Sequence, residues 1–173
     1  MQHEDKLIEI RNVTVWRGTT RVFNGLSLDI DRHERVAILG PNGSGKTTLL
    51  KLLNRELYPV AEPGSGVRIL GRERGNVWDL RKHIGVVSHD LQQRYTPSTT
   101  ALQVVVSGFY SSIGVHGQLA SRITESQRRA AQETLAELGL AEMSGRQLSQ
   151  MSTGQQRRCL LARALVHRPD TLI

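Results

Sequence analysis

Apolar and polar positions alternate with a period of two near the start of the chain, as is typical of β-strands. Residues 7–15 and 22–30 both show this alternation, and the turn-forming run 17–20 separates them. Two such strands joined by a short turn pair as an antiparallel hairpin. The pattern therefore predicts a hairpin with Trp16 at its tip, laid against the sheet that carries the next strand.

A continuous apolar run follows, Arg35–Leu39, and predicts a buried strand that leads into a glycine-rich loop. A helix is expected to begin directly after that loop, over residues 47–53. Further short elements are predicted from the later apolar runs: strands at 67–71, 84–87 and 171–173, and one or two helical turns at 78–83.

Helical spacing dominates from about residue 88 onward. Helices are expected from Thr99 or Thr100 to Val106, then from 124–127 to a stop at Gly139, and finally over 154–166. The pattern predicts an α/β fold in which residues 1–88 and 154–173 form the core and residues 89–153 form an inserted helical subdomain.

The composition places the chain among single-domain proteins without a membrane span. It has 173 residues, of which 38% are hydrophobic, and no run approaches the ~20 apolar residues that a span needs. The first residues lack the layout of a signal peptide. The single cysteine, Cys159, excludes an internal disulfide and fits a reducing cytoplasm.

The net charge of +7 comes from basic residues spread along the chain. No Lys/Arg-rich block with interleaved aromatic residues is present, so we expect a solvated basic surface and no direct nucleic-acid partner.

The glycine-rich loop matches G-x-x-x-x-G-K-[ST], the phosphate-binding loop of P-loop NTPases. Its expected nucleotide-binding residues are Gly40, Pro41, Asn42, Gly43, Ser44, Gly45, Lys46, Thr47 and Thr48. Gly40, Gly43 and Gly45 are expected to permit positive φ and a close approach of backbone amides to the α- and β-phosphates.

The helix that follows the loop would direct its positive N-terminal end at the same phosphates. Lys46 is expected to reach the β- and γ-phosphates, and the Thr47 hydroxyl to be a Mg²⁺ ligand. Glycine-rich loops between a strand and a helix also occur without a nucleotide. Here strand, loop, Lys, Thr and helix follow in the required order, so we expect ATP and Mg²⁺ as cofactors.

A second motif precedes the last helix, at Met151–Arg158. A polar loop with Ser152, Thr153, Gly154 and Gln155 opens onto the helix and provides another anion-binding N-terminus. Taken alone, this is equally well interpreted as an ordinary helix cap. It gains weight because it follows the phosphate loop after roughly a hundred residues, with a helical segment between.

With both motifs, the chain resembles the ATP-binding cassette (ABC) family over essentially its whole length. Met151 stands where Leu is usual in the second motif, and Thr153 where Gly is common. The resemblance implies an ABC-type P-loop NTPase core, made of a parallel sheet and an antiparallel β subdomain, with a helical subdomain inserted. It also implies a head-to-tail pair of cassettes, in which the signature residues 152–155 of one contact the γ-phosphate held by the other.

Two roles in that family have more than one candidate here. The family's Gln that contacts Mg²⁺ and the attacking water aligns with His89, and Gln92 or Gln93 serve equally if the loop is shifted. His89 is also interpretable as an exposed loop histidine. Trp16 and Arg17 align about equally well with the adenine-stacking position, and Trp16 is equally well interpreted as half-buried packing.

The resemblance further implies an ATPase subunit of an ABC transporter, cytoplasmic and peripheral at the inner membrane face, with membrane permease subunits as partners. Family cassettes continue with a strand ending in Asp and then a catalytic Glu. The sequence is therefore expected to be a fragment that lacks roughly the last quarter to third of a cassette and has no turnover alone. The alternatives are a non-transport ABC ATPase in translation, repair or regulation, and a catalytically silent nucleotide-binding module.

Overall fold

The computed structural model describes residues 6–73 and 76–173. The chain consists of two compact units, an N-terminal unit of residues 1–80 and a C-terminal unit of residues 81–173. The predicted division into a core of 1–88 plus 154–173 and a subdomain of 89–153 stays a prediction.

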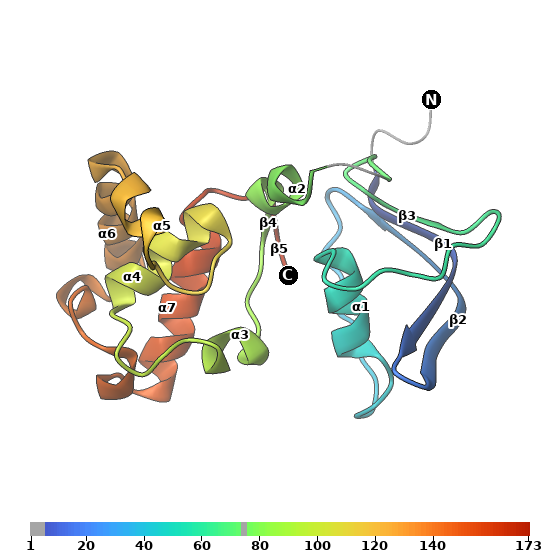
Figure 1. Cartoon of the computed structure of the whole chain (residues 1–173), viewed down its shortest axis with the longest axis horizontal. Helices are drawn as coiled ribbons and strands as arrows, with labels where there is room; N and C mark the ends of the chain where they lie inside the picture. Colours follow the sequence, from blue (N-terminus) through green and yellow to red (C-terminus); the bar gives the residue numbers. More distant parts are fainter. Residues whose placement is uncertain (1–5, 74–75) are drawn as a thin grey trace. The chain divides into compact units, whose positions relative to one another are not determined.

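A three-stranded antiparallel sheet with the order β2-β1-β3 forms the base of the N-terminal unit (Figure 1). Strands β1 (Lys6–Arg17) and β2 (Thr20–Asp31) form the predicted hairpin, and β3 (Gly66–Ile69) pairs with β1. Helix α1 (Lys46–Leu53) buries Leu49, Leu52 and Leu53. The chain passes to the next unit through helix α2 (Val77–His83).

The predicted strand Arg35–Leu39 is not formed. Residues 35–39 have no regular secondary structure, and Val36, Ile38 and Leu39 are 50%, 41% and 90% exposed. A strand is stabilised by hydrogen bonds to a neighbouring strand, and among the described residues no strand pairs with this run. The prediction of a buried strand is therefore wrong here, because apolar character alone supplies no pairing partner.

The C-terminal unit is mainly helical. Strands β4 (Ile84–Gly85) and β5 (Thr171–Leu172) form a short parallel pair, which joins the two ends of the unit. The intervening elements are α3 (His89–Gln93), α4 (Ala101–Val106), η1 (Ser107–Tyr110), α5 (Gln118–Arg122), α6 (Glu125–Glu137), η2 (Ala141–Met143), η3 (Leu148–Gln150) and α7 (Thr153–Leu165).

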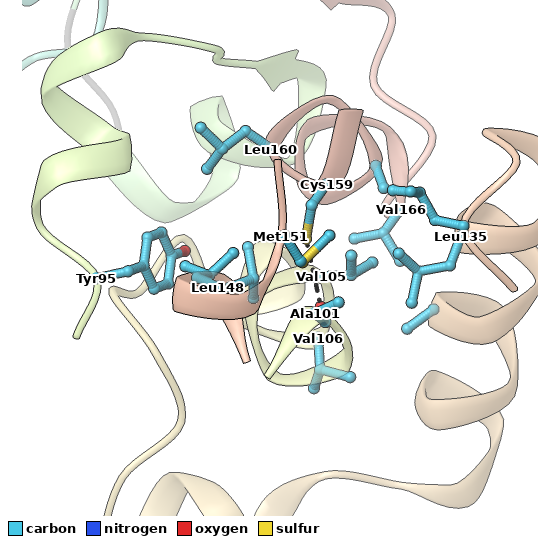
Figure 2. Packing of buried hydrophobic residues seen from close by; sticks show 14 of the residues in the cluster. Tyr95, Ala101, Val105, Val106, Leu135, Leu148, Met151, Cys159, Leu160 and Val166 are labelled. Atoms are coloured by element: carbon cyan, nitrogen blue, oxygen red, sulfur yellow. Dashed lines mark hydrogen bonds between the residues drawn. The ribbon is translucent and has the colours of Figure 1, made fainter. Parts of the chain in front are cut away.

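Helices α4, α6 and α7 pack on one another around the core of the C-terminal unit (Figure 2). Side chains from all three are fully buried, among them Val104, Val105, Leu135 and Cys159. Burial raises the pKa of the Cys159 thiol to about 12, so this cysteine is protonated at neutral pH and acts as an apolar core residue.

Candidate nucleotide site

The phosphate-loop motif lies at the N-terminus of α1. Gly45 is the N-cap residue, with φ 96° and ψ 3°, and within the described part of the chain no side chain makes a capping hydrogen bond at this helix start. The first turn also contains no acidic residue. The positive end of the helix is therefore exposed to a ligand, which favours an anion at this position.

Glycine is required at two positions of the loop by backbone conformation. Gly43 has φ 85°, and a Cβ on Gly45 would lie 2.7 Å from Cε1 of Phe23 in β2. The expectation of positive φ at Gly40 is wrong, because Gly40 is not among the residues with positive φ. Its constraint is steric, since a Cβ there would lie 2.8 Å from the Ser44 hydroxyl.

Lys46 folds back over the loop. Its ammonium group donates to the carbonyl oxygens of Gly40 at 2.6 Å and Pro41 at 2.7 Å. The Ser44 amide donates to the Pro41 carbonyl at 3.3 Å. These bonds place a positive charge across the mouth of the loop, close to the uncapped end of α1.

A cavity of about 810 Å³ opens beside the loop, within the N-terminal unit. Of the residues proposed from the sequence, Trp16, Arg17, Asn42, Gly43, Gly45, Lys46, Thr47 and Thr48 line it. Gly40, Pro41 and Ser44 belong to the loop but do not line the cavity. The hairpin contributes Gly18, Thr20 and Val22, and Leu57 comes from the segment after α1.

Sequence reasoning missed these four lining residues. The hairpin turn that follows Trp16 was a usable signal for Gly18 and Thr20, because a turn beside a cavity wall contributes its own residues. No sequence pattern around Leu57 indicates that this residue contacts a ligand. Among the described residues, the lining contains two cationic side chains, Arg17 and Lys46, and no carboxylate, so its charge suits a polyanion.

The signature residues lie at the start of α7, in the C-terminal unit. Ser152 is the N-cap residue, and it forms a capping box with Gln155: the Gln155 amide donates to the Ser152 hydroxyl at 3.3 Å, and the Ser152 amide donates to Oε1 of Gln155 at 2.8 Å. Thr153 is the first helical residue. Gly154 is exposed, and a Cβ built on it meets no atom within 4 Å.

The three candidates for the water-contacting role lie together on α3, which begins directly after the Ser88 N-cap. Gln92 is half-buried, and its Nε2 donates to Oε1 of Gln156 on α7 at 2.6 Å. Gln93 is exposed. The structure thus brings α3 and the signature helix together, and it brings Trp16, Arg17 and the phosphate loop together.

The described residues contain no cluster of three or more His, Cys, Asp or Glu side chains able to bind a metal ion. Among the same residues, no helix has both the length and the apolar character that a membrane span requires.

Residues 23–173 match the ABC transporter family model. This range covers most of the chain and contains both motifs. The chain belongs to this family, and the P-loop NTPase fold expected from the sequence is confirmed by solved cassette structures.

The curated relatives are named as ATP-binding proteins of transporters or transport systems. ModF of Escherichia coli (strain K12), an ABC transporter ATP-binding protein, is 36% identical over 96% of this chain and 34% of its own length. The glutamine transport ATP-binding protein GlnQ of the same strain is 32% identical over 96% of this chain and 66% of its own. The chain therefore spans between about a third and two thirds of these relatives.

Two solved structures share the fold. CbiO1 of Clostridium perfringens, part of the ABC transporter complex CbiONQ, has a TM-score of 0.73 and 25% identity, covering 98% of this chain and 64% of its own. A nucleotide-free ATP-binding cassette from an ABC transporter has a TM-score of 0.75 and 20% identity, covering 96% of this chain and 67% of its own.

Proposed function

We propose that this chain binds ATP with Mg²⁺ in the cavity beside α1 and serves as the ATP-binding part of an ABC transporter. The observation that carries the proposal is the uncapped N-terminus of α1, which lies with Lys46 at a cavity lined by cations and by no carboxylate. A triphosphate supplies the negative charge that such a site favours.

Each loop residue has a role that follows from its position. The amides near Gly43 and Gly45 donate to the phosphates, and Lys46 exchanges its bonds to the loop carbonyls for bonds to the β- and γ-phosphate oxygens. The Thr47 hydroxyl, which lines the cavity, is the candidate Mg²⁺ ligand. Bound Mg²⁺ would neutralise charge on the β- and γ-phosphate oxygens.

The signature loop is proposed to bind the nucleotide of a second cassette. Gly154 has ordinary backbone conformation and open space around its Cβ position, so nothing in its own unit requires glycine. A requirement for glycine would then come from a partner that approaches closely. The family resemblance of both motifs is the basis for proposing a head-to-tail dimer, attached at the cytoplasmic membrane face to permease subunits.

We further propose that residues 1–173 alone do not turn over ATP. Within the N-terminal unit, none of the described residues that line the cavity is a carboxylate that could orient an attacking water. His89, Gln92 and Gln93 remain candidates for contacting that water in the complete assembly.

The test is Lys46→Ala, with Lys51→Ala as the matched control. Lys51 is the same residue type on the same helix, and it does not line the cavity. Loss of a charge-assisted contact costs about 1.5–3 kcal/mol, which corresponds to a roughly tenfold to hundredfold loss of ATP affinity. Calorimetric ATP titration, with steady-state phosphate release in parallel, measures both binding and turnover.

Unchanged affinity in Lys46→Ala, or an equal loss in Lys51→Ala, would contradict the nucleotide site. Lys46-dependent turnover by residues 1–173 alone would show that a catalytic group lies within this chain.

A further inference from the structure

The side-chain amide of Gln156, one turn inside α7, makes hydrogen bonds through both its nitrogen and its oxygen. Its Nε2 donates to the carbonyl oxygen of Leu148 at 2.7 Å and to that of Met151 at 3.1 Å. Its Oε1 accepts a bond from Nε2 of Gln92 at 2.6 Å. Because the nitrogen is committed to two carbonyls, the oxygen must face Gln92, and Gln92 must present a donor.

The two carbonyl groups belong to the segment that enters the signature helix. Leu148 begins η3, and Met151 directly precedes the Ser152 N-cap. Both side chains are 6% exposed and lie in the helical core (Figure 2). The capping box of Ser152 and Gln155 satisfies the amides at the start of α7, while Gln156 holds the carbonyls just before it. The signature loop is thus fixed from both sides.

Gln92 connects this arrangement to a different part of the chain. Helix α3 has five residues and follows β4 after three residues, and its Leu91 is buried in the same core. A helix this short gains little stability from its own hydrogen bonds, so its position depends on contacts such as the bond to Gln156.

We propose that Gln156 is a positioning residue for the signature loop, and that its bond to Gln92 transmits the position of α3 to residues 148–152. This inference rests on the proposed function, in which the signature loop binds the nucleotide of a second cassette. Any movement of α3 that breaks the bond removes one of the three bonds of the Gln156 amide. The two bonds to the carbonyl oxygens of Leu148 and Met151 then remain as the restraint on the Gln156 amide, so the segment before the signature helix is held less tightly.

The experiment uses the full-length protein with Gln92→Leu, Gln156→Leu, the double variant and Gln92→Lys, which keeps a donor toward Gln156. Gln132→Leu is the control, because it makes the same Gln-to-Leu exchange at an exposed position of α6. Two quantities are measured for every variant in the same buffer. They are the rate of amide hydrogen exchange over residues 148–155 and the ATP concentration needed for dimerisation. Thermal melting identifies any variant that fails to fold.

Loss of one hydrogen bond changes an equilibrium by about twofold to tenfold. Gln92→Leu is expected to raise exchange over residues 148–155 by this factor and to weaken dimerisation equally. Gln156→Leu, which has no proposed contact with the nucleotide or the water, is expected to leave ATP binding by the monomer unchanged. The double variant is expected to be no worse than Gln156→Leu, because coupled residues are not additive. Gln92→Lys is expected to restore near-normal values.

Exchange over residues 148–155 that is unchanged in Gln92→Leu, or additive effects in the double variant, would overturn the coupling. If Gln156→Leu does not fold, the coupling is still tested by comparing exchange over residues 148–155 in Gln92→Leu and Gln92→Lys. Failure of the proposed function is recognised separately, as ATP binding that does not depend on Lys46.

Discussion

At the scale of single residues, Trp16 and Arg17 compete for one role. Both line the cavity. The Trp16 ring is 46% exposed, and the guanidinium carbon of Arg21 lies over it, 5.9 Å from the ring centroid. Trp16 and Arg21 are paired across the hairpin, so the indole is held in place from β2. A flat, partly exposed and prearranged ring is the better platform for a base.

We therefore expect Trp16→Ala to weaken ATP binding while leaving inorganic triphosphate binding unchanged. Stacking of one base on an aromatic ring contributes about 1–3 kcal/mol, or roughly fivefold to more than a hundredfold in affinity. Tryptophan fluorescence in a Trp78→Phe background reports the contact directly. If Arg17→Ala, and not Trp16→Ala, selectively weakens ATP, then Arg17 is the stacking residue. If neither does so, the packing interpretation of Trp16 is correct.

His167 is a second residue with an unusual environment. Both of its ring nitrogens are shielded from solvent, and neither makes a hydrogen bond of good geometry to the residues that the structure describes. Burial lowers the pKa of His167, the backbone of Ile84 opposes the shift, and the charges of Arg163 and His83 lower the pKa further. His83 itself is bonded to Asp170, with Nδ1 2.7 Å from Oδ2. The neutral imidazole is therefore the form that suits the folded state.

The pH dependence follows from the sign of this shift. The unfolded chain binds a proton on this group near the ordinary pKa of about 6.5, whereas the folded chain binds it only at lower pH. The contribution to stability is therefore complete above pH ~6.5 and is lost as the pH falls from that value toward the lowered pKa.

Urea unfolding of wild type and His167→Gln between pH 5 and 8 measures this dependence. The wild type is expected to lose more stability than the variant below pH ~6.5. Parallel curves for the two proteins would show that His167 does not carry the effect.

At the scale of helices and strands, the local signals were reliable. The residues Thr100, Thr124 and Ser152 each form a capping box with the Gln three positions later, and all three helix starts were predictable because a cap depends on near neighbours in sequence. The stop at Gly139 was predictable for the same reason, and its φ is 67°.

Elements that depend on distant partners were not predictable in the same way. The strand expected at Arg35–Leu39 is not formed, because strand formation requires a pairing partner as well as an apolar pattern. Helices α3 and α5 were missed, since five residues give too short a pattern for a helical period. The bond between Gln92 and Gln156 joins residues far apart in sequence, and no spacing rule indicates it.

At the scale of the whole molecule, the phosphate loop and the signature loop belong to different units. The loop of Gly40–Thr47 lies in residues 1–80, and the signature lies in residues 81–173. Both motifs were predictable from the sequence, because each is an anion-binding helix terminus formed by residues that are close together in the chain. Whether the signature serves the nucleotide of its own chain or of a partner is a property of the assembly. A substitution that distinguishes contact with the nucleotide of its own chain from contact with that of a partner is therefore the most informative test.

Gly154→Asp in the full-length protein is such a substitution, with Gly145→Asp as the matched control. Both glycines are exposed, have no positive φ and have no atom within 4 Å of a built Cβ. Position 154 is in the first turn of α7, where a carboxylate stabilises the helix by about 0.3–1 kcal/mol. Thermal stability should therefore be unchanged or slightly raised, so a loss of function is not attributable to unfolding.

A carboxylate at position 154 would face the γ-phosphate of the partner's nucleotide, and like charges brought together across an interface cost several kcal/mol. We expect Gly154→Asp to abolish ATP-driven dimerisation, measured by light scattering, and to leave ATP binding by the monomer within about twofold of wild type. Gly145→Asp should retain both properties. Equal loss of ATP binding in the monomer would mean instead that Gly154 contacts the nucleotide of its own chain, because only then does the new charge reach the phosphate without a partner.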